Sequence, residues 1–344
     1  MINIVERSSL DEAGYSCLQL QVKPQPIYSN LNFLDAIASH TNSKLLFVVS
    51  TDGGKIDATL PFCIYPGVYG PVINSLPFFG SHGGITSLDK NVSQSKEIID
   101  ALMAFARTID CAAVTVIEPL FNREPQGTYK DFDYRDSRIG LYNEVDYESD
   151  SEAIIKSFDS RARNSIRKAT KSGIKVVQSQ SSESIDFLSQ IHFENMTSAG
   201  RKAKSKKFFV EFLRTVPNGN WIILEAHLEE ERVASLLLIF TSDIVEYFTP
   251  VTLAEYKHLQ PLSLLIFHGF VFANQKQIRY WNWGGTWMTQ SGVYKFKKQW
   301  NPRETEYSYY TKIFNQRILD VDAQILMSAY PYFYVYPVNG TSNP

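Results

Sequence analysis

The sequence of 344 residues lacks several features that would assign it to a class of protein at once. It has only three cysteines, Cys17, Cys63 and Cys111, which lie far apart in the chain. That spacing excludes a disulfide framework and a paired metal-ligand motif. A formal net charge of −2 excludes a strongly basic nucleic-acid binder on overall charge, so we expect no DNA partner. No Gly-x-Ser-x-Gly motif is present, which argues against an α/β-hydrolase.

Long hydrophobic runs are also missing. The most apolar stretch, Pro261–Ala273, contains His268 and is too short to span a bilayer. The first residues show no basic start followed by an apolar core, so we expect no signal peptide. These absences predict a soluble, reduced, cytoplasmic protein without an integral membrane segment. They carry no signal for an oligomeric state.

An alternation of helix and strand patterns runs through the chain, of which 44% is hydrophobic. It favours an α/β fold with mixed sheets. Residues 121–150 lack periodic apolar positions, and we interpret them as a linker. The expected strands are 45–50, 58–64, 112–118, 174–178, 221–227, 232–241, 244–249, 278–283 and 305–312. The expected helices are 92–108, 151–172, 183–198 and 260–274.

Basic residues are concentrated in one segment. Between Lys156 and Lys207 there are twelve lysines and arginines and four acidic residues, so this segment carries 12 − 4 = +8 and the remainder −10. In the helix expected at 151–172, Arg163, Arg167 and Lys171 recur at steps of four, close enough to grip a phosphate jointly. The alternative is an ordinary solvated helix face.

The segment Trp281–Trp300 combines features of a binding cleft. An apolar strand (278–283) stops at Gly284–Gly285, a polar loop follows, and Lys297 stands next to Phe296. A cation among aromatic rings at a strand end can stabilise negative charge that develops in a reaction. The alternative is a turn followed by a solvated lysine helix.

Three strings together resemble the FemABX peptidyltransferases and the wider FemAB-like (BioF2-like) acyltransferases of the GNAT superfamily. They are Arg161–Lys175 (RARNSIRKATKSGIK), the Gly284–Gly285 strand end with Phe296–Lys297, and the glycine-rich Pro77–Gly84. The resemblance implies two tandem GNAT-like domains sharing a cleft. We place them at residues 1–145 and 146–314. The aromatic tail, 315–344, packs back on the first domain or contacts a partner.

The resemblance also implies a reaction and its site. It predicts transfer of an acyl or aminoacyl group to an amine of a nucleotide-linked sugar, glycan or peptidoglycan precursor, from aminoacyl-tRNA or acyl-CoA and without a further cofactor. Lys297 falls on the family's functional lysine, with Phe296 beside it. Residues expected to contact acceptor or donor are Arg161, Arg163, Arg167, Arg201, Tyr247, His82, Trp283, Gly284 and Gly285.

Some family features are absent, and alternatives stay open. No Gln/Arg-x-x-Gly-x-Gly/Ala loop for the coenzyme A pyrophosphate is present, which argues against a standard acetyl-CoA site. No His/Cys cluster suggests a metal. The four tryptophans of 281–300 form a stacking platform or, more in keeping with their size, core and cleft walls. The alternative function is a phosphate- or RNA-binding protein that has lost the reaction.

Overall fold

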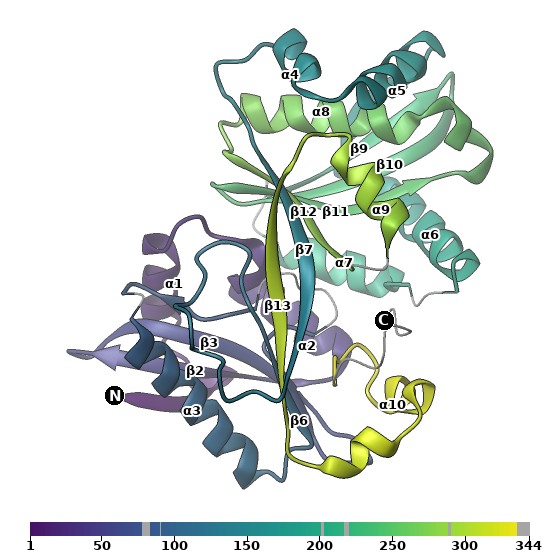
Figure 1. Cartoon of the computed structure of the whole chain (residues 1–344). Helices are drawn as coiled ribbons and strands as arrows, with labels where there is room; N and C mark the ends of the chain where they lie inside the picture. Colours follow the sequence, from purple (N-terminus) through teal and green to yellow (C-terminus); the bar gives the residue numbers. More distant parts are fainter. Residues whose placement is uncertain (78–82, 90, 201–202, 217–219, 288–289, 336–344) are drawn as a thin grey trace. The chain divides into compact units, whose positions relative to one another are not determined.

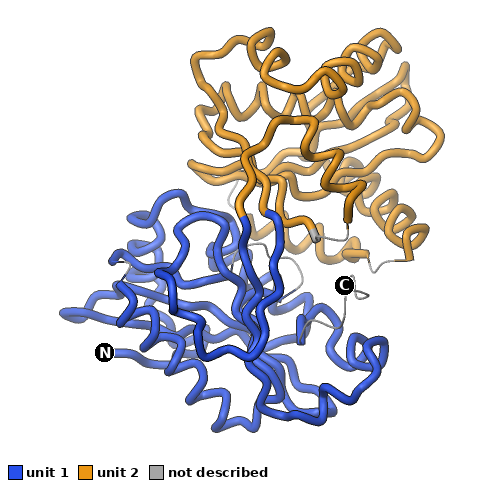
Figure 2. Tube along the Cα trace, viewed as in Figure 1, with its two compact units in different colours: residues 1–139, 306–344 blue, residues 140–305 orange. Residues whose placement is uncertain are grey.

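The computed structural model describes residues 1–335 except 78–82, 90, 201–202, 217–219 and 288–289, and of Trp287 only the backbone. The chain forms two compact units (Figure 2). Unit 1 comprises Met1–Ile139 and Glu306–Pro344, and unit 2 comprises Gly140–Thr305. The chain passes between them within strands β7 (Tyr134–Glu144) and β13 (Arg303–Ile313). The limits expected from the sequence, 145 and 314, lie a few residues after these divisions.

Unit 1 contains a mixed sheet in the strand order β1-β2-β3-β4-β6-β13-β7, with β5 paired to β3. Within it, β4 runs parallel to β6. Besides β7 and β13, its strands are β1 (Ile2–Glu6), β2 (Lys44–Asp52), β3 (Lys55–Tyr65), β4 (Val72–Asn74), β5 (Thr86–Ser87) and β6 (Ala113–Ile117). Its helices are η1 (Arg7–Ser9), α1 (Glu12–Gln21), η2 (Ile27–Ser29), α2 (Leu31–Thr41), α3 (Val92–Thr108), η4 (Gln316–Asp320) and α10 (Ala323–Ala329).

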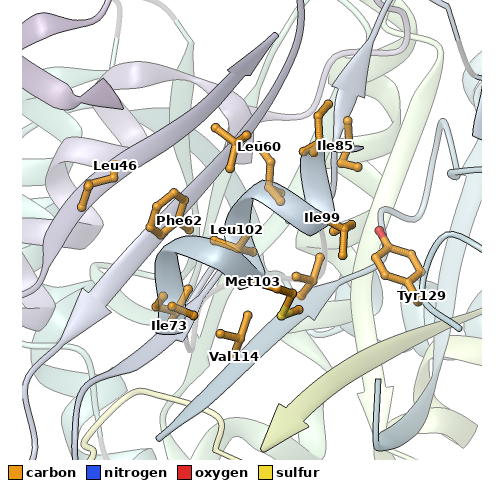
Figure 3. Close-up of a cluster of buried hydrophobic side chains, with 14 of the residues drawn as sticks. Leu46, Leu60, Phe62, Ile73, Ile85, Ile99, Leu102, Met103, Val114 and Tyr129 are labelled. Atoms are coloured by element: carbon orange, nitrogen blue, oxygen red, sulfur yellow. The ribbon is translucent and has the colours of Figure 1, made fainter. Parts of the chain in front are cut away.

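Helix α3 supplies one side of the unit 1 core. Its residues Ile99, Leu102 and Met103 pack with side chains of the strands, among them Phe62 and Val114 (Figure 3). The apolar positions of α3 recur at the helical period, and Asn91 caps its first turn by accepting a hydrogen bond from the amide of Gln94. The helix expected at 92–108 is therefore confirmed with its predicted ends.

Unit 2 contains a second mixed sheet, in the order β7-β12-β11-β10-β9-β8. Here β11 runs parallel to β12. Besides β7 and β13, its strands are β8 (Lys175–Ser179), β9 (Trp221–Leu228), β10 (Glu231–Phe240), β11 (Ile244–Thr252) and β12 (Tyr280–Trp287). Its helices are α4 (Ser151–Ser157), α5 (Ser160–Lys171), α6 (Ser182–Ser198), α7 (Lys206–Thr215), η3 (Ala254–Leu259), α8 (Pro261–Gln275) and α9 (Ser291–Lys298).

The helices of unit 2 cover both faces of its sheet (Figure 1). Helices α4 and α5 contact α8, which packs on β9, β10 and β11, whereas α6 packs with α7 on the opposite face. Helix α8 is apolar almost all round because it is buried between α5 and the sheet.

Both units repeat the same order of elements. A strand, two helices, three antiparallel strands, a helix and a parallel strand follow one another, as β1-α1-α2-β2-β3-β4-α3-β6 in unit 1 and as β8-α6-α7-β9-β10-β11-α8-β12 in unit 2. The predicted α/β fold with mixed sheets is confirmed.

Three sequence-based expectations were wrong. Residues 121–150 are not only a linker, because β7 occupies 134–144; few of its residues are apolar, and it is held by pairing with β13 and β12. The helix expected at 151–172 is two helices, since Asp159 caps a new one by accepting from the amide of Ala162. The strand expected to stop at Gly284 continues to Trp287.

The C-terminal segment of the described chain is part of unit 1. Tyr330 is 1% exposed, its hydroxyl donates to the carbonyl of Gly70, and the amide of Tyr69 donates to that hydroxyl. The backbone of Tyr334 exchanges two hydrogen bonds with the side chain of Asn74. None of the helices in the described ranges is long and apolar enough to cross a membrane.

Candidate active site

Two parallel strands of unit 2 separate soon after they begin to pair. Within the described residues, β11 and β12 form three register pairs, of which the last joins Glu246 and Asn282, although both strands continue beyond it. The register between β11 and β10 also shifts next to Phe248, as at a β-bulge. Bulges redirect side chains and are common beside active sites. The place where β11 and β12 separate is therefore the candidate active site.

A local distortion of β12 at Gly284–Gly285 begins two residues after the last rung, and the strand continues through it to Trp287. We call this distortion the glycine turn. Gly284 has φ +70, a left-handed conformation that side chains disfavour. The Oδ1 of Asn282 accepts a hydrogen bond from the Gly284 amide at 2.9 Å. The Nδ2 of Asn282 donates to Oε2 of Glu246 at 2.8 Å, in a fully buried contact. The side chain of Asn282 thus connects the neighbouring strand to the turn.

Lys297 points from α9 into this turn. The residue is 6% exposed. The ammonium donates to Oγ1 of Thr286 at 3.1 Å, the carbonyl of Gly285 at 3.3 Å and the carbonyl of Gly284 at 3.5 Å. No carboxylate forms an ion pair with it in the described part of the chain. Two of the predicted binding residues, Gly284 and Gly285, are therefore direct partners of the predicted catalytic lysine.

Burial sets the protonation of this amine. Removal from water disfavours the charged form and lowers the pKa of Lys297 to about 7. Both the ammonium and the free amine are then populated near neutral pH. The other lysines of α9, Lys295 and Lys298, are exposed as expected for surface charges, and Lys298 pairs with Glu304.

The hydrogen bonds of Lys297 leave it able to take another partner. All three are longer than the usual N–H···O distance of about 2.9 Å. An ammonium held by weak hydrogen bonds away from water can exchange one of them for a hydrogen bond to an oxygen that gains negative charge, at little cost in reorganisation. The arrangement suits stabilisation of an oxyanion or donation of a proton to a leaving group.

Aromatic rings pack beside the turn. Tyr247 is half-buried, with its ring 5.1 Å from that of Trp283, and burial raises the pKa of its hydroxyl. Trp283 is 2% exposed and donates from Nε1 to Asn143. The ring of Phe296 lies 6.4 Å from that of Trp300, which is fully buried. Burial of Trp281, Trp283 and Trp300 confirms the expectation that at least two tryptophans of this segment pack in the core.

The basic helix α5 presents only part of the expected phosphate grip. Arg161 and Arg167 are exposed, as is Lys171. Arg163 instead turns back to the break between α4 and α5, where Nη1 donates to the carbonyl of Phe158 at 2.6 Å. The helix break leaves a carbonyl that needs a donor, and Arg163 supplies it. The prediction that Arg163 shares an anion-binding face with Arg167 and Lys171 stays a prediction.

Four contributors to the site were not singled out from the sequence. Thr286 and the Glu246–Asn282 pair hold Lys297 and the glycine turn. Asn143 of β7 accepts from Trp283 and donates to the carbonyl of Trp300, two residues past the end of α9. Only the spacing Asn282-x-Gly284, which is typical of an Asx turn, offered a signal.

The glycine-rich segment of unit 1 is partly described. A side chain at Gly84 would lie 2.4 Å from both Oε1 of Glu124 and Pro119, so only glycine fits. Burial raises the pKa of Glu124, which accepts from the amide of Ile85, to about 7. Gly83 and Gly84 line a pocket of this unit. Two predicted binding residues, His82 and Arg201, lie outside the described residues. In the described ranges, no cluster of His, Cys, Asp and Glu could hold a metal.

Comparison with known families gives one match within the chain. Residues 156–298, which include α5, the separating strands and Lys297, match the model of the acetyltransferase (GNAT) domain. No curated protein matches the sequence.

Solved structures match over nearly the whole chain at low sequence identity. FemX matches with a TM-score of 0.69 and 12% identity, over 90% of this chain and 98% of FemX. The C-terminal domain of an Agrobacterium fabrum protein, provisionally designated a lysylphosphatidylglycerol synthetase, matches with a TM-score of 0.58 and 9% identity, over 94% of this chain and 98% of that chain. A tandem GNAT protein from the clavulanic acid biosynthesis pathway matches with a TM-score of 0.56 and 10% identity, over 91% of this chain and 98% of that chain.

Proposed function

Because residues 156–298 are a GNAT acetyltransferase domain and the chain is a FemX-like GNAT protein in fold, we propose that it is an N-acyltransferase. It forms an amide on an amino group of a nucleotide-linked sugar, glycan or peptidoglycan precursor used in the cell envelope or in polysaccharides. The acyl or aminoacyl group comes from aminoacyl-tRNA or acyl-CoA. The observation that carries the proposal is the buried ammonium of Lys297 at the point where β11 and β12 separate.

The reaction needs no protein nucleophile. The acceptor amine attacks the ester or thioester carbonyl, and a C–N bond forms while the carbonyl oxygen gains negative charge. Protonated Lys297 donates a hydrogen bond to that oxygen or a proton to the departing oxygen or sulfur. The C–O or C–S bond then breaks, and the extra proton of the amide nitrogen passes to Lys297 where the lysine has protonated the leaving group, and otherwise to the departing oxygen or sulfur. Orientation and electrostatic stabilisation supply most of the rate.

An aminoacyl-tRNA donor is supported by the charges of α5. Arg161, Arg167, Lys168 and Lys171 are exposed on this helix, which contains no acidic residue between its ends. Such a helix face suits RNA phosphates. An acyl-CoA donor is less favoured, because the chain lacks the glycine loop that usually holds the pyrophosphate. The name of the Agrobacterium relative, a lysylphosphatidylglycerol synthetase, is consistent with aminoacyl transfer.

The test is a transfer assay. The purified protein is incubated with radiolabelled aminoacyl-tRNA or acyl-CoA and a set of amino-sugar nucleotides and peptidoglycan precursors. We expect one labelled amide product, and a loss of turnover of about 100- to 1,000-fold in Lys297→Met, the size expected for one oxyanion donor. Lys295→Met, which removes an exposed lysine of the same helix, is the matched control. Full turnover in Lys297→Met would remove Lys297 from the mechanism.

A second candidate function rests on the same exposed basic residues of α5. The protein would then bind RNA or phosphate without catalysis. Its mark is an RNA affinity that falls steeply with salt, together with no product from any donor. Arg167→Gln combined with Lys171→Gln lowers that salt dependence by about one counterion for each phosphate that is no longer neutralised, whereas Lys297→Met leaves it unchanged.

A further inference from the structure

The Glu246–Asn282 pair lies behind the catalytic lysine and connects to it through the glycine turn. Glu246 is 2% exposed and Asn282 is fully buried. They come from β11 and β12 and form the last rung before these strands separate. A carboxylate in such a place costs free energy unless hydrogen bonds hold it. An apolar pair at these two positions would pack at a lower cost in free energy, so the presence of this polar pair needs an explanation.

The hydrogen bonds of the pair lead in one direction. The Nδ2 of Asn282 donates to Glu246 at 2.8 Å, so the Oδ1 of Asn282 can accept from the residues that follow it in β12. That Oδ1 accepts the amide of Gly284 at 2.9 Å and holds the residue at φ +70. The carbonyls of Gly284 and Gly285 then accept from Lys297. The orientation of the Asn282 amide thus decides where the carbonyls that receive the ammonium point.

We infer that Asn282, oriented by Glu246, is a positioning residue of the transfer reaction: it sets the glycine turn that holds the Lys297 ammonium at the separation of β11 and β12. This inference rests on the proposed function. A displacement of a catalytic group by about 1 Å can cost about 100-fold in rate. The pair therefore contributes to turnover although neither residue touches the substrate.

The two side chains can be exchanged without loss of their hydrogen bonds. Asn282→Asp alone places two carboxylates across the rung, and their repulsion turns the side chain away from Glu246. The double variant Glu246→Gln/Asn282→Asp restores the contact with the donor on the other strand, and the new carboxylate at position 282 would still accept the amide of Gly284. Glu246→Gln alone keeps an acceptor for Asn282 and serves as the matched control.

The expected results form a rescue pattern. Asn282→Asp lowers kcat about 10- to 100-fold with little change in KM, and recovers partly at acidic pH, where the two carboxylates share a proton. The double variant returns to within about threefold of the original chain. The titratable groups on the elements packed against β11 and β12 include Tyr247 on β11, His192 on α6, His268 on α8 and Tyr294 on α9. All of them are unchanged in every variant.

A second readout needs no substrate. The contribution of Lys297 to the pH dependence of stability is measured by comparison with Lys297→Met. For the original chain, Asn282→Asp and the double variant, the gain in the free energy of unfolding between pH 7 and pH 9 is measured with and without Lys297→Met, and the difference between the two gains is taken. In Asn282→Asp this difference between pH 7 and pH 9 falls below half its original value, because the displaced glycine turn no longer holds the ammonium away from water. If no donor yields product, the proposed function fails, and this readout still decides the positioning role.

Three outcomes overturn the inference and leave the proposed function standing. The first is an active chain in which Asn282→Asp keeps its kcat and its Lys297-dependent pH response. The second is a folded double variant as slow as Asn282→Asp. The third is a folded double variant without activity, in the case that Asn282→Asp does not fold. Full activity of the double variant in that case supports the inference.

Discussion

Burial of the Lys297 ammonium makes stability depend on pH in a defined direction. The pKa of this lysine falls from the ordinary value of 10.5 to about 7 because the folded chain removes it from water. Between these values the unfolded chain binds one proton more than the folded chain, so stability increases as the pH rises. The stability lost through desolvation is fully recovered only above the unfolded-state pKa, and the cost of the charged form is fully present below pH 7.

The magnitude follows from the pKa values. A pKa lowered from 10.5 to about 7 corresponds to roughly 5 kcal/mol of preference for the neutral amine. Integration over the two titrations gives a gain in the free energy of unfolding of about 2 kcal/mol between pH 7 and pH 9. Lys297→Met has no amine to titrate, so its gain over the same interval is smaller by that amount.

The assay is urea unfolding at pH 7 and pH 9, followed by circular dichroism, for three chains. The original chain and Lys295→Met should show the same gain, because Lys295 is exposed and remains in water after folding. Lys297→Met should fall short of both by about 2 kcal/mol. Both variants replace one lysine of α9 by methionine, so the change of residue type is matched. Equal gains in all three chains would refute the claim that folding desolvates the ammonium.

Three further variants test local features of the fold. Gly284→Ala, at φ +70, should lower the free energy of unfolding by about 1–2 kcal/mol, and an unchanged urea midpoint would contradict the strained turn. Asp159→Ala, which removes the acceptor for the Ala162 amide, should cost about 1 kcal/mol, whereas Asp159→Asn should cost little; equal losses would exclude the capping role. Gly67→Ala would place a methyl group 2.0 Å from the Tyr330 ring, so limited proteolysis should cut the C-terminal segment faster, and an unchanged cleavage rate would show that the segment adapts.

The order of elements was predictable where periodicity is strong. The helix at 92–108 and the nine expected strands appeared at or within a few residues of their expected places, because apolar positions repeat at the period of the element, whereas the strands β1, β4 and β5 were not expected. The FemABX-like GNAT resemblance is confirmed by the matched domain and by the FemX fold. Strand β7 escaped prediction because pairing with neighbouring strands, not its own apolar pattern, stabilises it.

The candidate site was predicted in part, and the reason lies in distance along the chain. The spacing of residues 281–300 by itself indicated a lysine-bearing segment after Gly284–Gly285, with Lys295, Lys297 and Lys298 as candidates, and the resemblance to the FemABX proteins selected Lys297. The sequence also determined that basic residues gather near α5. Both signals come from residues that lie close together in the sequence.

Only the tertiary structure decided which groups hold the lysine. Glu246 and Asn282 are 36 residues apart, separated by helix α8, and meet through the register of two parallel strands. The same structure turned Arg163 toward the Phe158 carbonyl. Hydrogen-bond partners of buried groups depend on which strands pair and where helices break. Those choices follow from the packing of the whole unit, and no short stretch of sequence contains them.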